Sequence, residues 1–284
     1  MNKVKEKGME LLFLIAACCS ILSVALICVF LFVNGIPAMG KIGLFDFLLG
    51  EKWAPSNKMY GVLSMILGSI YITAGAILIG VPVGILTAVF LARYCPKWLY
   101  RFLKPLVNLM AGIPSVVYGF FGMCVLVPMT RDWFGGDGNS ILTASILLGI
   151  MILPTIIGVA ETSIRAVPDH YYQGALALGA THERSVFMAE LPAAKSGIMA
   201  GVILGVGRAI GETMAVIMVA GNQARVPVGL LKGARTLTAN IVMEMGYATG
   251  LHREALIATG VVLFVFILII NVLFSILKKR TVEG

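Results

Sequence analysis

The chain alternates between long apolar segments and shorter polar ones. Hydrophobic residues make up 59% of it, and each apolar segment reaches the roughly 20 residues that a helix needs to cross a bilayer. These segments lack the period-two alternation of a membrane β-barrel. The pattern predicts an all-α polytopic membrane protein with six transmembrane helices. The expected spans are 11–33, 62–92, 105–130, 140–160, 197–221 and 255–277.

The charges lie mainly between these spans. Only 13% of the residues are charged, and the net charge is +8. Because the positive charge flanks spans, it indicates orientation in a membrane rather than nucleic-acid binding. Six spans place both termini on one side, which holds thirteen Lys and Arg residues against eight on the other. The richer side is expected to be cytoplasmic, so we predict cytoplasmic N- and C-termini and a basic cytoplasmic tail at 278–284.

The sequence contains no motif for enzyme chemistry of its own. The glycine-rich Gly-x4-Gly-Lys-Ser/Thr run that cradles phosphates of ATP does not occur. The three histidines do not have metal-ligand spacing, and the five cysteines lie in or beside apolar runs as small apolar residues. We therefore expect no catalytic residue, no bound metal and no cofactor on this chain.

A polar loop, 161–196, connects the fourth and fifth spans and has a helical pattern of its own. Its first short helix is expected to end at Gly179. Thr181 can cap a second short helix, which Pro192 is expected to close. The small residue Gly174 would let the surface of another protein approach the first helix closely. This pattern predicts a compact docking surface at the membrane.

The fifth span carries Arg208 and Glu212 within an apolar run, and at helical spacing they share a face with Gly201 and Gly205. A charge at the centre of a span costs at least ~2.5 kcal/mol and usually faces protein or water. One interpretation is a substrate pathway, where the guanidinium meets an anion through its planar donors and Thr213 adds a hydroxyl. The other is an arginine–glutamate pair that locks two helices together.

The third span contains a second candidate. Pro114 frees a backbone carbonyl inside the membrane, which neighbours or a cavity must satisfy. Ser115 and Tyr118 could line such a cavity. Equally, the proline could only kink the helix and Tyr118 could belong to the core.

Three runs of the sequence carry a resemblance. Gln173-Gly174-Ala175, then Gly179, then Leu191-Pro192 have the spacing of the E-A-A-x-x-x-G-(nine)-I-x-L-P loop of ABC importer permeases, with Gln173 in place of Glu. Ala189 replaces the usual Ile. The runs 207–216, GRAIGETMAV, and 111–120, AGIPSVVYGF, resemble the C-type permease subunit of phosphate-specific transport systems. Residues 1–60 carry no such match.

The resemblance implies the type I ABC importer permease fold in a bacterial cytoplasmic (inner) membrane. It implies a permease domain at 62–277 with a coupling loop at 161–196. Before this domain, the uncharged run 11–33 predicts a transmembrane anchor followed by an external loop, together at 1–61. Arg208, Glu212, Thr213, Ser115 and Tyr118 are the expected pathway residues. The expected coupling-loop residues are Gln173, Gly174, Ala175, Gly179, Leu191 and Pro192.

The resemblance also implies the partners. They are a homologous second permease, forming a heterodimer, two ATPase subunits that bind ATP and Mg²⁺, an extracytoplasmic phosphate-binding protein and membrane lipid. The implied function is ATP-driven import of inorganic phosphate by alternating access. Two alternatives stay open: a permease for another oxyanion such as sulfate or molybdate, and an ion-coupled secondary transporter that uses Arg208 and Glu212 as a proton relay. The coupling loop argues against the second, because such a carrier has no use for it.

Overall fold

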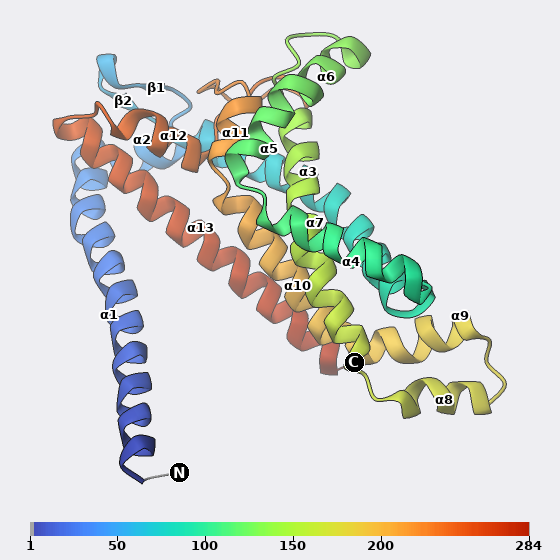
Figure 1. The fold of residues 1–284 in the computed structure, drawn as a ribbon. Coiled ribbons are helices and arrows are strands. Elements are labelled where there is room, and N and C mark those ends of the chain that lie inside the picture. Colours follow the sequence, from blue (N-terminus) through green and yellow to red (C-terminus); the bar gives the residue numbers. More distant parts are fainter. Residues whose placement is uncertain (1–2, 284) are drawn as a thin grey trace.

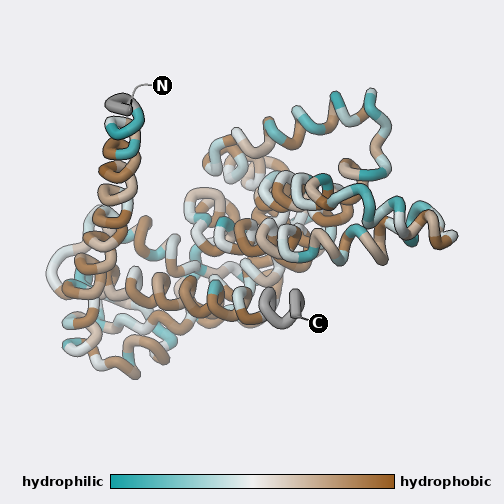
Figure 2. Tube along the Cα trace, turned by 90° about the horizontal axis from the view of Figure 1, so that it is seen from below, coloured by the Kyte–Doolittle hydropathy of each residue, from teal (hydrophilic) through white to brown (hydrophobic). Residues whose placement is uncertain are grey.

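Most of the long helices of the chain pack into a bundle, and the N-terminal helix joins it at one end and stands away from it along its first half (Figure 1). The computed structural model describes residues 3–283, with side chains described for residues 6–276. The side chains of the expected basic tail at 278–284, and of Lys3 and Lys5, lie outside the described residues. Within the described residues, five helices are long and apolar enough to cross a membrane, or six if one bent helix pair counts as a span. Figure 2 shows hydrophobic residues predominating along them. The predicted polytopic helical architecture is confirmed.

The N-terminal helix α1 (Lys3–Ile42) is longer than the predicted span and continues through Pro37. Residues 34–60, expected to form a loop, instead finish α1 and then fold into short elements. A side chain at Gly35 would collide with Val261 of the last helix, so this glycine lets the two helices pack closely. The short elements are α2 (Leu44–Leu49), β1 (Trp53–Ala54), the 3-10 turn η1 (Pro55–Asn57) and β2 (Met59–Tyr60), with β1 antiparallel to β2.

Three helices form the centre of the bundle. They are α3 (Leu63–Val89), continued by the π-helical turn η2 (Phe90–Tyr94), α7 (Ile141–Arg165) and α10 (Leu191–Gly211). Gly80 and Gly84 of α3 lie directly against Ile152 and Ile156 of α7. On the other side, Gly205 of α10 also packs on Ile156. The small residues that the sequence predicts along the fifth span are therefore used for close packing against α7.

The third apolar segment is not one straight helix. It consists of α4 (Lys97–Gly112), α5 (Ser115–Phe121), the π-helical turn η3 (Gly122–Leu126) and α6 (Val127–Phe134). The axis bends by 99° between Lys97–Gly112 and Ser115–Phe134. The expected basic loop at 93–104 is wrong, because residues from Lys97 onward are already helical. Pro114 explains the break, since proline disfavours helical backbone in the residue before it.

The fifth apolar segment is also interrupted. Helix α10 ends at Gly211, and the short helix α11 (Met214–Val219) begins after two non-helical residues. The chain then returns through an irregular stretch to α12 (Leu237–Met245) and the long last helix α13 (Gly250–Glu283). The predicted uninterrupted span 197–221 is therefore wrong at its C-terminal third. Hydropathy does not reveal this break, because both sides of it are apolar.

A buried glutamate holds together the end of the molecule that carries the hairpin. Glu244 of α12 accepts hydrogen bonds from the indole of Trp53 at 2.8 Å and from the guanidinium of Arg235 at 2.6 Å. Its carboxylate also contacts Nε2 of His252 at 2.8 Å. These three partners come from the N-terminal hairpin, the irregular stretch and α13. The hairpin is thus packed onto the C-terminal part of the chain.

Candidate functional site

Two helix breaks lie next to each other on a partly exposed side of this chain. One separates α4 from α5 at residues 113–114, and the other separates α10 from α11 at residues 212–213. The helices that follow these breaks pack together, since a Cβ on Gly119 of α5 would lie 3.0 Å from the Cα of Ala215 in α11. The five residues predicted for the pathway occupy these breaks and the helix ends beside them.

Arg208 lies in the last turn of α10 and is half-buried. Its Nη1 is 3.5 Å from the hydroxyl of Thr155 on α7, which is at the limit of a hydrogen bond. Among the described residues, no salt bridge is formed by Arg208. The described part of the structure thus holds a partly buried cation beside a hydroxyl group and without a carboxylate partner.

Glu212 does not pair with Arg208, and the predicted locking pair is wrong for this conformation. The helix ends at Gly211, and Glu212 has extended backbone angles, φ −69° and ψ 131°. Its side chain therefore leaves the face that carries Arg208. Instead, the Glu212 carboxylate accepts hydrogen bonds from the backbone N–H groups of Thr213 at 3.2 Å and Ala215 at 3.3 Å. A carboxylate is favourable there because the N-terminal N–H groups of a helix lack partners.

Thr213 and Tyr118 satisfy backbone carbonyls at the two breaks. The Thr213 hydroxyl donates to the carbonyl of Gly211 at 3.2 Å. Tyr118 is 6% exposed, and its hydroxyl donates to the carbonyl of Met110 at 2.9 Å, on the far side of the bend. This bond supports the structural alternative for Tyr118, in which the aromatic side chain stabilises the kink. Ser115 is half-buried at the start of α5.

The polar loop contains α8 (Asp169–Ala177), the first of the two predicted short helices, and α9 (His182–Ser185), which begins a longer helix. Both lie at the end opposite to the hairpin and α12 (Figure 1). Gly179 has φ +85°, a left-handed conformation that glycine adopts without strain, so the predicted turn is confirmed. The cap is confirmed too, since the Thr181 side chain accepts the backbone N–H of Arg184 at 3.3 Å.

Pro192 does not close the second helix, contrary to prediction. The helix runs without interruption from His182 to Gly211. A proline ring normally clashes with the carbonyl four residues earlier. Here the π-helical turn η4 (Val186–Glu190) lies just before it, and a wider turn of this kind accommodates such a residue. The second half of the loop and the fifth span as far as Gly211 are therefore one continuous helix.

The exposed surface of the loop is apolar at several positions. Leu178 is 91% exposed beside the Gly179 turn, and Met188 is 75% exposed on η4. Gln173 and Gly174 are exposed on α8, and a Cβ added to Gly174 would meet nothing within 4 Å. Ala175 and Leu191 are half-buried, and Pro192 is exposed. Exposed apolar side chains on a polar loop indicate a protein-binding surface.

Charged residues that the sequence analysis missed join α4 to α7 and the end of α3 to the loop. Glu161 on α7, 2% exposed, accepts hydrogen bonds from Lys104 at 2.7 Å, Tyr100 at 2.8 Å and Arg165 at 2.9 Å. Nearby, Arg93 on η2 pairs with the buried Glu190 on η4. The sequence does carry a signal for these residues. Each charge lies at the edge of an apolar run, where a charge without a partner is costly.

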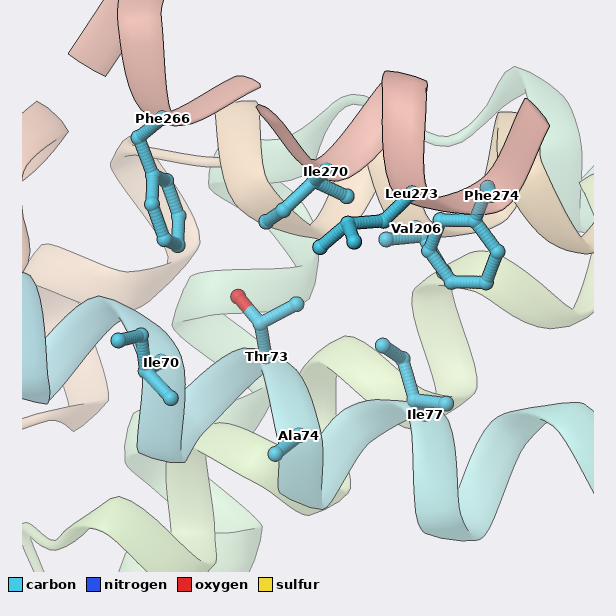
Figure 3. A pocket seen from close by; sticks show the side chains of 9 residues that line it. All are labelled: Ile70, Thr73, Ala74, Ile77, Val206, Phe266, Ile270, Leu273 and Phe274. Carbon is cyan, nitrogen blue, oxygen red and sulfur yellow. The ribbon is translucent and has the colours of Figure 1, made fainter. Parts of the chain in front are cut away.

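An apolar groove between α3, α10 and α13 has a volume of about 380 Å³. Figure 3 shows its nine lining side chains, among which the Thr73 hydroxyl is the only polar group. A hydrated anion cannot exchange its water for these side chains without a large loss of free energy. The groove is therefore unsuited to an anionic ligand and fits an apolar occupant.

Comparison with known proteins gives consistent matches over most of the chain. Residues 80–283 match the family described as binding-protein-dependent transport system inner membrane component. The probable ABC transporter permease protein YqgH of Bacillus subtilis is 37% identical over 276 residues, which cover 92% of this chain and 89% of that protein. The phosphate transport system permease protein PstC of Mesorhizobium japonicum is 37% identical over 261 residues, covering 84% and 80%.

A solved structure supports the fold. The bacterial alginate ABC transporter, in complex with an alginate pentasaccharide-bound periplasmic protein, contains a chain that aligns with a TM-score of 0.68. The alignment covers 100% of this chain and 99% of that chain at 15% sequence identity. At this identity the likeness concerns the fold alone.

Proposed function

Because the chain belongs to the family of binding-protein-dependent transport system inner membrane components, we propose that it is the permease subunit of an ATP-driven inorganic phosphate importer. It is a multi-pass protein of the inner membrane with the type I ABC importer permease fold. Its relatives are permease subunits rather than enzymes. In the proposed complex, separate ATPase subunits bind ATP and Mg²⁺.

The observation that carries the proposal of an anionic substrate is the environment of Arg208. A guanidinium that stays charged, has no carboxylate partner here and lies beside the Thr155 hydroxyl can donate two parallel hydrogen bonds to phosphate oxygens. Glu212 lies within the same pair of helix breaks but points to the backbone of α11. Its negative charge close by would weaken the binding of the anion. Transport requires such weakening, because the anion must be released again. Ser115 and Thr213 are the further hydroxyls that we assign to this pathway.

The 161–196 loop is the proposed contact with the ATPase subunits. Its apolar surface at Leu178 and Met188 is exposed in the isolated chain. The residues that follow the family spacing, Gln173 to Ala175 and Gly179, lie beside that surface on α8 and its turn. On the orientation that the cation count predicts, this end of the molecule is cytoplasmic, where ATP is.

Two further apolar surfaces support the proposed membrane partners. The most hydrophobic stretch of α1 is entirely unburied within this chain, and Figure 1 shows its N-terminal half standing away from the other helices. The groove of Figure 3 is equally apolar. A single chain leaves both surfaces uncovered, so lipid and a homologous second permease are the partners that they fit. An extracytoplasmic phosphate-binding protein would deliver the substrate at the opposite end from the loop.

The two alternative functions, permease for another oxyanion and proton-coupled transporter, are not equally well supported. A permease for sulfate or molybdate would use the same guanidinium chemistry, so the site alone does not exclude it; the identity to PstC favours phosphate. A proton relay through Arg208 and Glu212 has no support here, because the two side chains do not contact each other. In the proposed cycle, ATP binding closes the ATPases, the loop moves with them, and the Arg208 region changes its access from one side to the other.

Uptake by a reconstituted complex tests this function. The chain is placed in vesicles with its second permease, ATPase and binding-protein partners, and uptake of labelled phosphate and sulfate is compared. We expect ATP-dependent uptake of phosphate and none of sulfate. Gly174→Leu adds a side chain that meets nothing within this chain, so it should abolish ATPase attachment and uptake while the permease pair stays intact. Equal uptake of sulfate would contradict the assigned substrate, and normal uptake by the Gly174 variant would contradict the docking surface.

A further inference from the structure

The end of α3 and the coupling loop meet at a cluster of polar side chains. Arg93, in the turn η2 that ends α3, pairs with Glu190 in η4 at the base of α10. The same guanidinium is 3.9 Å from the carboxylate of Asp169 and 5.7 Å from the ring centre of Tyr172, both on α8. One side chain of α3 thus contacts both halves of the loop.

A second contact runs beside it. The ring of Tyr94, next to Arg93, packs edge-on against His182 of α9 with 4.8 Å between ring centroids. The hydroxyl of Tyr172 lies 2.7 Å from Nδ1 of His182 and so connects α8 to α9. The loop is therefore held together as one body, and that body is attached to α3 as well as to α10.

The ion pair in this cluster is deeply buried. The side chain of Glu190 is 0% exposed and that of Arg93 is 21% exposed. A carboxylate without water must keep a cationic partner, because an uncompensated buried charge costs several kcal/mol. Any movement of the loop must therefore either carry Arg93 with it or open the pair at that cost.

The pair is also only half formed. Nη2 of Arg93 contacts Oε1 of Glu190. Nε of Arg93 and Oε2 of Glu190 are both buried and have no hydrogen-bond partner among the described residues. These are the two atoms that would complete a two-point arginine–carboxylate pair, in which two parallel N–H groups donate to the two oxygens. Leaving these two buried groups unpaired is costly, which favours an arrangement in which they meet.

We propose that Arg93 is the positioning residue through which the coupling loop moves α3, and that its pair with Glu190 changes from one contact to two when the loop moves. This inference rests on the proposed function, since it takes the ATPases as the source of the movement. Loop motion then reaches the bundle by two routes. One is the continuous helix into α10, and the other is the Arg93–Glu190 pair into α3, which packs along α7.

Arg93→Lys is the informative variant, because lysine keeps the charge that Glu190 needs but cannot form a two-point pair. Phosphate uptake and ATP hydrolysis are measured together in vesicles containing the whole complex. We expect the variant complex to assemble and to hydrolyse ATP, while phosphate imported per ATP falls about tenfold, as expected for one charge-assisted hydrogen bond. Arg101→Lys, on the exposed side of α4, is the matched control and should change nothing. The double variant Arg93→Gln with Glu190→Gln leaves this pair without a buried charge. It should lower the ratio of phosphate imported to ATP hydrolysed by the same factor as Arg93→Lys.

A distance measurement separates failure of this inference from failure of the proposed function. Spin labels on Leu176→Cys of α8 and Leu86→Cys of α3, both exposed positions, report the attachment of loop to helix in a variant without other cysteines. We expect a narrow distance distribution when Arg93 is present and a broad one in the Arg93→Lys variant. An unchanged distribution, or an unchanged ratio of phosphate to ATP, overturns the proposal. If the complex without the Arg93 substitution imports no phosphate, the proposed function is wrong. The distance distribution then still tests whether Arg93 attaches the loop to α3.

Discussion

Two regions of this chain place an arginine and a glutamate four residues apart, and they give opposite results. On α7, Glu161 and Arg165 form a salt bridge of 2.9 Å. At the end of α10, Arg208 and Glu212 have the same spacing and do not pair, because the helix stops at Gly211 between them. Spacing of three or four residues brings side chains together only where the helix continues through both.

The comparison distinguishes two uses of charge near a membrane. The α7 cluster is closed, since Lys104 and Tyr100 complete the donors around Glu161. The Arg208 region is open, since its cation contacts a hydroxyl and its carboxylate binds backbone. A charge with a full set of protein partners contributes to structure. A charge without them remains able to bind a ligand.

Removing Glu161 should have the largest effect on stability. Glu161→Ala leaves Lys104, Arg165 and Tyr100 without their shared acceptor, and breaking a buried ion pair costs about 3 kcal/mol or more. Thermal unfolding of the purified permease, followed by tryptophan fluorescence, should show a clearly lowered midpoint. Glu51→Ala, at an exposed position, is the control. Equal midpoints for the two variants would mean that the α7 cluster is not structural.

Removing Arg208 should affect transport instead. Arg208→Gln should reduce phosphate uptake on the order of 10- to 100-fold, the value of charged hydrogen bonds to the anion, with an unfolding midpoint like that of the parent. Glu212→Gln should leave the midpoint unchanged, because its amide oxygen can still accept from Thr213 and Ala215, and should lower uptake less than Arg208→Gln, because it removes only the charge that favours release of the anion. A strongly lowered midpoint for Arg208→Gln would show that Arg208 is structural after all, and the difference between the two regions would disappear.

Topology is tested by a change that should leave activity intact. In a variant whose five cysteines are replaced, a cysteine at the exposed position of Arg184 or of Arg225 is offered a membrane-impermeant thiol reagent. The thirteen cations on the side of the loop predict labelling of residue 184 only from the cytoplasm and of residue 225 only from outside. Reversed labelling would place the Glu161 cluster on the external side.

Much of the fold follows from local patterns in the sequence. Hydropathy predicts the apolar segments, and the Gly179 turn and Thr181 cap follow from the conformations that these residues favour. Pro114 indicates the break at 113–114, whereas the break at 212–213 escapes such patterns, because a change of direction leaves hydropathy unaltered. Pro192 is predicted wrongly because the turn η4 that accommodates it has no clear sequence signal.

The candidate site was predictable in its residues but not in their contacts. The charges on an apolar run identify Arg208 and Glu212, yet their separation depends on where one helix ends. The Arg93–Glu190 pair joins residues 97 positions apart. The sequence places each of these residues only at the edge of an apolar run. Only the packing of α3 against the loop brings them together.

The uninterrupted helix from His182 to Gly211 has a mechanical consequence. Its 30 residues make a rod about 45 Å long, at 1.5 Å for each residue, with the loop at one end and Arg208 near the other. Such a rod acts as a lever. A tilt of about 5° at the loop would displace the Arg208 end by about 4 Å over that length, more than the length of a hydrogen bond. A small rocking of the loop is thus sufficient to make or break every contact between the guanidinium and a bound anion.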